Sequence, residues 1–127
     1  MNNLIAASFG NVFGSTSLAA NTTTTIAKSE VVHEASSIAA LWLPNYGWRT
    51  YYQNTAGYIC ECVSSDGAAW STGSTLNADG ASGTPISISL AEVPYKNLFY
   101  IGAANDELYT FGFNSAYWTE RMAPMPL

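Results

Sequence analysis

The sequence predicts an all-β protein built from repeated four-stranded units, the pattern of a partial β-propeller. Short segments alternate between apolar and polar residues and are separated by turn residues, and none has the length or periodicity of a convincing helix. A repeat of roughly 30 to 50 residues made of short strands is typical of propeller-like arrays. The segments of the clearest copy are 38–42, 49–53, 58–61 and 70–73, those of the next copy are 86–90, 98–101, 107–110 and 118–120, and 5–9 echoes the first segment of each.

The middle copy predicts an inner strand at 38–43, further strands at 49–53 and 58–63, and an outer strand near Trp70. Within the inner strand, Ile38, Ala40 and Trp42 fall on one face. Turn residues separate the strands at 44–47, 54–57 and 65–67, and a longer turn is expected at 77–83.

The third copy repeats this order, and the first copy is shorter. Ile86, Ile88 and Leu90 share one face of the third copy's first strand. From Ile5 to Thr16 is 11 residues, as in the middle copy, but the first copy ends at Ser37 before an outer strand. We therefore expect units at 37–80 and 84–127, after a degenerate first blade or N-terminal arm at 1–36 in which 28–37 could form a short helical turn.

Composition limits the classes of function. The 127 residues suit one compact domain, and 48% of them are hydrophobic, but only 10% are charged and the net charge is −5. The four basic residues are scattered, which argues against nucleic acid and anionic membranes as partners. No apolar run is long enough for membrane insertion, and the N-terminus lacks a secretory signal, so we expect a cytoplasmic protein unless it is secreted by another route.

The two cysteines, Cys60 and Cys62, lie two residues apart. In a strand they would share one face with a geometry poor for a mutual disulfide, so we expect them to fill a sheet face. A metal site with His33 is the alternative, but a lone C-x-C and one histidine are a weak signal. We predict no metal and no cofactor.

Two or three blades cannot close a propeller by themselves. Each open sheet would leave an apolar face and a strand edge exposed, which self-association would remedy. Three blades per chain would close as a dimer and two as a trimer, with six blades in either case. We therefore expect a homo-oligomer.

The middle copy contains Ser37-Ile-Ala-Ala-Leu-Trp, Arg49-x-Tyr-Tyr-Gln, Ile59-x-Glu61 and Trp70-Ser-Thr-Gly. With these segments it resembles a blade of the fungal fucose-specific lectin family, six-bladed β-propeller lectins that include short bacterial relatives with two blades per chain. The resemblance weakens outside 37–73. It implies a pocket for L-fucose or a similar neutral sugar between adjacent blades, and fucosylated glycans or a small neutral ligand as partners.

The resemblance also implies a role for each site residue. Arg49 and Glu61 match the pair that hydrogen-bonds the sugar hydroxyls, and Trp118 matches the tryptophan of the following blade. Phe113 stands at an aromatic position of the family, and Tyr95 lies near the position of a lining residue. Arginine supplies only donors and a carboxylate only acceptors, so the pair suits vicinal hydroxyls, while an indole covers the apolar face of a pyranose.

The other copies depart from this pattern. Leu98 and Thr110 replace the pair in the third copy, and Thr16 and Lys28 replace it in the first, so at most one full pocket per chain is expected. Any lectin activity would then depend on oligomerisation for avidity.

Other interpretations compete with sugar binding. Arg49 and Glu61 could form a cross-strand salt bridge, Trp70 and Trp118 could be core residues, and we assign Trp42 and Trp48 to packing. We expect no enzymatic activity, because no nucleophile motif or phosphate loop is present. The alternatives are a pericyclase-like enzyme of fungal natural-product biosynthesis, using a pocket of Leu98, Thr110, Phe113 and Trp118, and a scaffold protein without a ligand.

Overall fold

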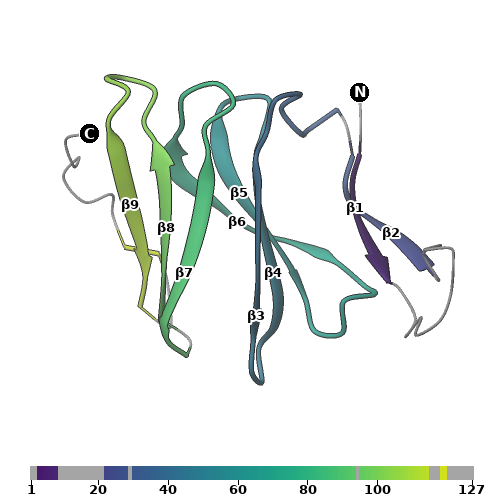
Figure 1. Ribbon diagram of the computed structural model, residues 1–127. Coiled ribbons are helices and arrows are strands. Elements are labelled where there is room, and N and C mark those ends of the chain that lie inside the picture. The colour runs from purple at the N-terminus through teal and green to yellow at the C-terminus, as the bar shows by residue number, and fades with distance from the viewer. Residues whose placement is uncertain (1–2, 9–21, 29, 94, 115–117, 120–127) are drawn as a thin grey trace, which may run out of the picture.

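The computed structural model describes residues 3–8, 22–28, 30–93, 95–114 and 118–119, and these form three separate antiparallel sheets (Figure 1). The N-terminal sheet contains β1 (Leu4–Ser8) and β2 (Thr22–Ala27). The central sheet has the order β3-β4-β5-β6, with β3 at Ile38–Leu43, β4 at Gly47–Gln53, β5 at Tyr58–Ser64 and β6 at Ser71–Asp79. The C-terminal sheet has the order β7-β8-β9, with β7 at Ile86–Glu92, β8 at Tyr95–Ile101 and β9 at Leu108–Phe113.

The all-β prediction is confirmed for these residues, and the four-stranded unit of the middle copy is present as an up-and-down meander. Its first strand, β3, has the predicted bounds, 38–43. No sheet formed by the described residues closes on itself (Figure 1). The propeller arrangement therefore stays a prediction.

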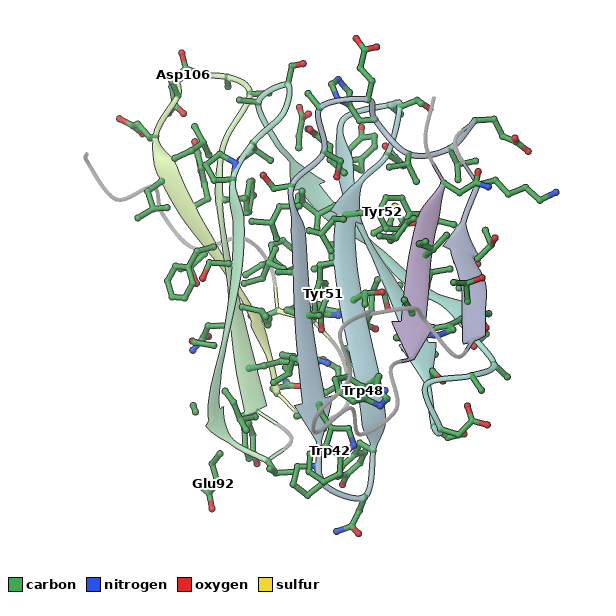
Figure 2. All side chains as sticks on the ribbon, turned by 45° about the vertical axis from the view of Figure 1, so that its right-hand side comes forward. Trp42, Trp48, Tyr51, Tyr52, Glu92 and Asp106 are labelled. Carbon is green, nitrogen blue, oxygen red and sulfur yellow. The ribbon has the colours of Figure 1, made fainter. Side chains whose placement is uncertain are left out.

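Both faces of the central sheet carry buried side chains. Tyr51 and Tyr52 are consecutive residues of β4, so they point to opposite faces, and both are buried. We call the side of the central sheet that carries Tyr51 the Tyr51 face, and it packs on the C-terminal sheet (Figure 2). The opposite side, which carries Tyr52, Cys60 and Cys62, is the Tyr52 face, and it packs on the N-terminal sheet. The cluster on the Tyr51 face contains Ile59, Leu76, Ala78, Ile86, Leu98, Tyr100, Tyr109 and Phe111. Each large apolar side chain buried there contributes about 1.5–3 kcal/mol, so face-to-face packing is the main force holding the sheets together.

A buried glutamine joins the turns at one end of the molecule. Gln53, the last residue of β4, is 0% exposed. Its Nε2 donates to the carbonyl oxygens of Gly57, Gly80 and Ala81 at 2.9–3.0 Å, and its Oε1 accepts from the Gly83 amide at 2.9 Å. The hairpin after β4 and the connection between β6 and β7 are therefore tied to one side chain.

One expectation about the elements was wrong in detail. The turn expected at 77–83 begins later, because β6 continues to Asp79. The segment at 28–37 contains a short turn, in which the Lys28 carbonyl accepts from the Val31 and Val32 amides at 3.1 and 3.3 Å, and Val32 also forms a bridge with Asn54. No helix long and apolar enough to cross a membrane occurs in the described part of the chain.

Trp42 and Trp48 were also misassigned to packing. They pair across β3 and β4 at one end of the central sheet (Figure 2), where they are 52% and 41% exposed. Leu4 and Ala27 of the N-terminal sheet pack with Tyr52 on the Tyr52 face. A cavity between the two sheets borders Trp48, so the indole of Trp48 is not fully covered.

The outer copies are less regular than the middle one. β1 pairs directly with β2, with Ile5 opposite Thr25. The strand expected around Thr16 falls outside the described residues. Near the outer strand expected at Trp118, the structure has an isolated bridge between Trp118 and Phe113.

Candidate functional site

Glu61 lies on the Tyr51 face in the middle of β5, directly across from Tyr51. Its side chain is buried, and its Oε2 accepts a hydrogen bond from the Tyr51 hydroxyl at 2.7 Å. Gly73 of β6 lies against the same side chain, because a Cβ there would be 2.9 Å from Oε1. The carboxylate is thus enclosed by its own sheet on two sides.

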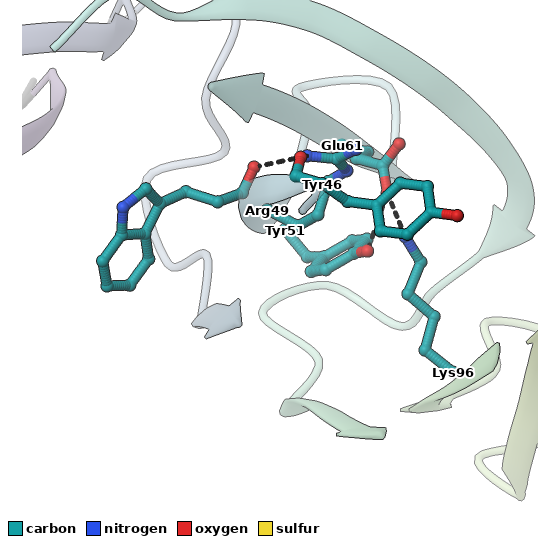
Figure 3. Close-up of polar contacts among 6 residues, drawn as sticks. Tyr46, Arg49, Tyr51, Glu61 and Lys96 are labelled. Atoms are coloured by element: carbon teal, nitrogen blue, oxygen red, sulfur yellow. Dashed lines mark hydrogen bonds and ion pairs between the residues drawn. The ribbon is translucent and has the colours of Figure 1, made fainter. Parts of the chain in front are cut away.

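The charge partner of Glu61 comes from the neighbouring sheet. Lys96 reaches across from β8, and its Nζ lies 3.2 Å from Glu61 Oε2 (Figure 3). Lys96 is only 3% exposed, because it lies on the same buried face of β8 as the core residues Leu98 and Tyr100. This ion pair therefore links the central and C-terminal sheets inside the molecule.

Aromatic rings surround the Lys96 ammonium. Its Nζ is 4.5 Å from the centroid of the Phe113 ring, 5.2 Å from that of Trp118 and 5.9 Å from that of Tyr51. All three distances are within the range of a cation–π interaction. We call these three rings, with Glu61, the Lys96 cage.

The rings of the Lys96 cage also contact each other. Trp118 meets Tyr51 edge-on at 5.9 Å between centroids and meets Phe113 at 5.5 Å. The position of Trp118 is set by its bridge to Phe113 and by the next residue, Thr119, whose amide donates to the Gly112 carbonyl at 2.6 Å. Trp118 Nε1 is buried and has no hydrogen-bond partner among the described residues.

Burial dominates the electrostatics of this site. Loss of solvation lowers the pKa of Lys96, although the nearby Glu61 charge acts in the opposite direction. Burial, followed by the negative charge of Glu61, raises the pKa of Tyr51 far above its ordinary value. Tyr51 therefore stays a hydrogen-bond donor to the carboxylate at all physiological pH values.

The structure places Arg49 outside the Lys96 cage. Arg49 pairs with Val63 across β4 and β5, and its Nη1 donates to the carbonyl oxygens of Tyr46 and Trp48, each at 2.8 Å (Figure 3). Among the described residues, the ion pair of Glu61 is with Lys96 and not with Arg49. The cross-strand Arg49–Glu61 salt bridge considered from the sequence is therefore not formed.

The predicted sugar-binding residues thus fall into two groups. Glu61, Phe113 and Trp118 come together around Lys96. Tyr95 is 45% exposed at the start of β8 and is not one of the rings around the ammonium. The space between Glu61 and Trp118 that the resemblance assigns to a sugar is occupied by the lysine side chain.

Arg49 instead lines an open pocket of about 390 Å³ next to the cage. Arg49, Val63 and Ser71 stand side by side on β4, β5 and β6, so the pocket crosses three strands. The other lining residues are neutral: Tyr46, Ser64, Ser65, Ala69 and Trp70. Trp70 donates from Nε1 to the Gly67 carbonyl at 3.1 Å, which fixes the orientation of its ring.

Sequence reasoning missed Lys96. The signal was present, since Lys96 stands two residues before Leu98 and four before Tyr100 in a strand with period-2 alternation. A lysine at such a position is directed into the core and needs a buried partner. The sequence alone does not tell which of the nine acidic residues supplies it.

The cysteine prediction is confirmed. Cys60 and Cys62 share the Tyr52 face, and both are buried and free. Within the described ranges, no group of three or more histidine, cysteine or acidic side chains is arranged to hold a metal ion. His33 is tied to the adjacent loop through its contact with Ser82 at 3.1 Å.

Searches of known proteins give no independent indication of the activity: no protein-family model and no curated protein sequence matches this chain.

Proposed function

We propose that this protein binds carbohydrate, with L-fucose or a similar neutral sugar held in the pocket lined by Arg49. The observation that carries the proposal is the position of the arginine: its guanidinium borders an open pocket of about 390 Å³ whose other lining residues are aromatic, small or hydroxylated. Uncharged pyranoses are recognised by a combination of this kind, a few directed hydrogen bonds and an aromatic surface.

Each group in the pocket has a suitable chemical role. Nη1 of Arg49 is held by two backbone carbonyls, which orients the guanidinium, and its other N–H groups are donors for sugar hydroxyls. Trp70, with its ring held by Gly67, offers an aromatic surface, and the hydroxyls of Ser65 and Ser71 can both donate and accept. Among the described residues that line the pocket, none carries a carboxylate, which distinguishes it from the Arg–Glu site that the sequence resemblance suggests.

We also propose that the chain self-associates. The three sheets are open, and Ile5, Ile38, Trp42 and Trp48 are large hydrophobic residues with exposed fractions of 41–56%. A second copy covering this surface would remove apolar area from water and would present several sugar pockets at once.

The pericyclase-like alternative receives no support from the residues first considered for it. Leu98 is 0% exposed and Thr110 is 9% exposed, and Phe113 and Trp118 pack on Lys96. These side chains belong to the packed interface between the central and C-terminal sheets. We therefore carry only the sugar-binding proposal forward.

The test is binding of L-fucose and of a glycan array by Arg49→Ala compared with the unmodified protein. Losing hydrogen bonds from a charged donor costs about 1.5–3 kcal/mol, so affinity should fall roughly 10- to 150-fold while the far-UV spectrum is unchanged. Lys28→Ala is the matched control, because it removes an exposed positive charge outside the pocket. Unchanged binding by Arg49→Ala would remove this pocket from consideration.

A second variant distinguishes the two possible sugar sites. Trp70→Phe should weaken binding if the sugar lies in the Arg49 pocket, whereas Trp118→Phe should do so if it displaces Lys96 from its cage. A sugar-binding protein affected only by Trp118→Phe would contradict our placement of the ligand. The absence of binding to any glycan would reject the function itself.

A further inference from the structure

The guanidinium of Arg49 has one edge that the described residues do not use. The carbonyl oxygens of Tyr46 and Trp48 both accept hydrogen bonds from Nη1, each at 2.8 Å, so this nitrogen is occupied. The remaining N–H groups are on Nε and Nη2, and one from each points in parallel along the same edge of the planar group. Two parallel donors of this kind fit two oxygens of one carboxylate or sulfate group.

The positive charge of Arg49 is also not neutralised within the described part of the chain. Glu61, on the neighbouring strand, forms its ion pair with Lys96. Arg49, Lys96 and Glu61 together therefore carry one excess positive charge next to the pocket. The charge of Arg49 reaches the buried pair, where it adds to the larger effect of burial in lowering the pKa of Lys96. In a chain with a net charge of −5, this is a local positive site.

The acidic residue closest in sequence to the pocket lining, Asp66, is engaged elsewhere. Its Oδ1 accepts hydrogen bonds from the Ala68 and Ala69 amides at 2.9 and 3.0 Å and from the Ser64 hydroxyl at 3.1 Å. Asp66 lines the cavity next to the N-terminal sheet, and it is not among the described residues that line the Arg49 pocket. The carboxylate is thus held by its own loop and leaves the guanidinium to a ligand.

We propose that the ligand of the Arg49 pocket is an acidic glycan, in which the neutral sugar ring carries a sulfate ester or a carboxylate that pairs with the Nε–Nη2 edge of Arg49. This inference rests on the proposed sugar-binding function and adds the anionic group to it. The second N–H of Nη2 and the hydroxyls of Ser65 and Ser71 remain for the sugar hydroxyls. The pocket volume of about 390 Å³ falls within the range of small-molecule sites.

The test compares three kinds of ligand by calorimetric titration of the full-length chain. They are methyl α-L-fucopyranoside, its 2-, 3- and 4-monosulfate esters, and methyl α-L-galactopyranosiduronate, in which a carboxylate replaces the methyl group of the fucose ring. Hydrogen bonds to a charged group are stronger than neutral ones, so at least one acidic ligand should bind roughly 5- to 12-fold more tightly than the neutral glycoside. Raising NaCl from about 50 mM to about 500 mM should reduce this preference, because salt screens exposed charges.

The outcomes separate this inference from the function on which it rests. If the neutral glycoside binds and no acidic ligand binds more tightly, the inference is wrong and the sugar-binding proposal stands. If none of the ligands binds, fucose binding and this inference are both rejected. If inorganic sulfate binds as tightly as the best acidic ligand, the pocket is a site for free anions, and the acidic glycan is ruled out.

One variant and its control connect the preference to the guanidinium. Arg49→Gln removes the charge and the paired edge but keeps an amide donor, so neutral and acidic ligands should bind it weakly and with similar affinity. Lys28→Gln removes an exposed positive charge outside the pocket and should leave the preference unchanged. If Arg49→Gln, confirmed as folded by circular dichroism, kept the full preference, the anionic group would be binding elsewhere and the inference would be wrong.

Discussion

At the scale of single residues, the feature with the largest consequence is the buried lysine. Lys96 is held by one carboxylate and three rings, so the free energy of its burial depends on each of these partners. A charged group removed from water is tolerated only when it is paired. If one partner is lost, the other stays buried and its desolvation penalty is no longer compensated.

We expect Lys96→Met to lower the free energy of unfolding by about 3–5 kcal/mol, because Glu61 would remain buried without its cation. Urea denaturation followed by circular dichroism measures this change. Lys28→Met, which alters an exposed lysine, should change stability by less than about 0.5 kcal/mol. The double variant Lys96→Met/Glu61→Gln should recover much of the loss, and a double variant no more stable than Lys96→Met would contradict the pairing.

The free energy of unfolding at alkaline pH should depend on the ionisation of Tyr52. Burial, with smaller contributions from Cys60 and Cys62, raises the pKa of Tyr52 from 10.0 to about 12. Between these pH values the unfolded chain loses a proton that the folded chain keeps, so the free energy of unfolding falls as pH rises.

Tyr52→Phe removes this contribution. The stability difference between Tyr52→Phe and the unmodified protein should therefore be constant below pH 9 and should shift in favour of the variant between pH 10 and 12. Urea denaturation at pH 8, 9, 10 and 11 measures the shift. A pH-independent difference would show that Tyr52 ionises equally in the folded and unfolded chain.

At the scale of elements, the four strands of the central sheet form a complete unit because their connections are specified locally. Asn45 and Gly47 adopt positive φ values of 67° and 80° in the β3–β4 turn, the conformation that asparagine and glycine accept most readily. Gly47 also lies against the Ser64 backbone, so a side chain there has no space. Gln53 then closes the opposite end of the unit.

Gln53→Leu should destabilise the protein by about 3 kcal/mol, because three carbonyls and one amide would lose their buried partner while the side-chain volume is nearly kept. Thermal and urea unfolding measure the loss. Gln53→Glu tests the same cluster differently: it keeps the acceptor for the Gly83 amide but has no donor for the carbonyls, so it should be at least as unstable. A fully stable Gln53→Leu variant would show that water replaces the amide group.

At the scale of the whole molecule, three sheets stack through two separate clusters, and none of the sheets built from the described strands closes. The packing leaves open the outer strands and the surface around Trp42 and Trp48. Open strand edges next to exposed apolar residues favour association with another chain.

We therefore expect multi-angle light scattering to give two or three times the chain mass of 13.6 kDa. Trp42→Ser/Trp48→Ser should shift the mass towards that of one chain, because these indoles contribute apolar area to the proposed contact. Far-UV circular dichroism controls for folding of the variant. A single-chain mass for the unmodified protein at high micromolar concentration would contradict self-association.

Short-range patterns were enough to predict much of this architecture from sequence. Alternation in 38–43 and the turn residues after it specify β3 and its hairpin, and the spacing of Cys60 and Cys62 places both on one face. These features depend on neighbours along the chain, so they can be recognised without knowledge of what packs against them. The family resemblance placed Glu61, Phe113 and Trp118 in one candidate site, and in the structure all three side chains lie around Lys96.

Only the tertiary structure decided what occupies the space between these side chains. Lys96 is 35 residues from Glu61 in sequence, and its choice of partner depends on how two sheets stack, which no local pattern encodes. The direction of Arg49 and the exposure of Trp42 and Trp48 were decided in the same way. The sequence by itself determined the strands and their faces, because these follow from backbone periodicity, whereas the contents of each interface follow from long-range packing.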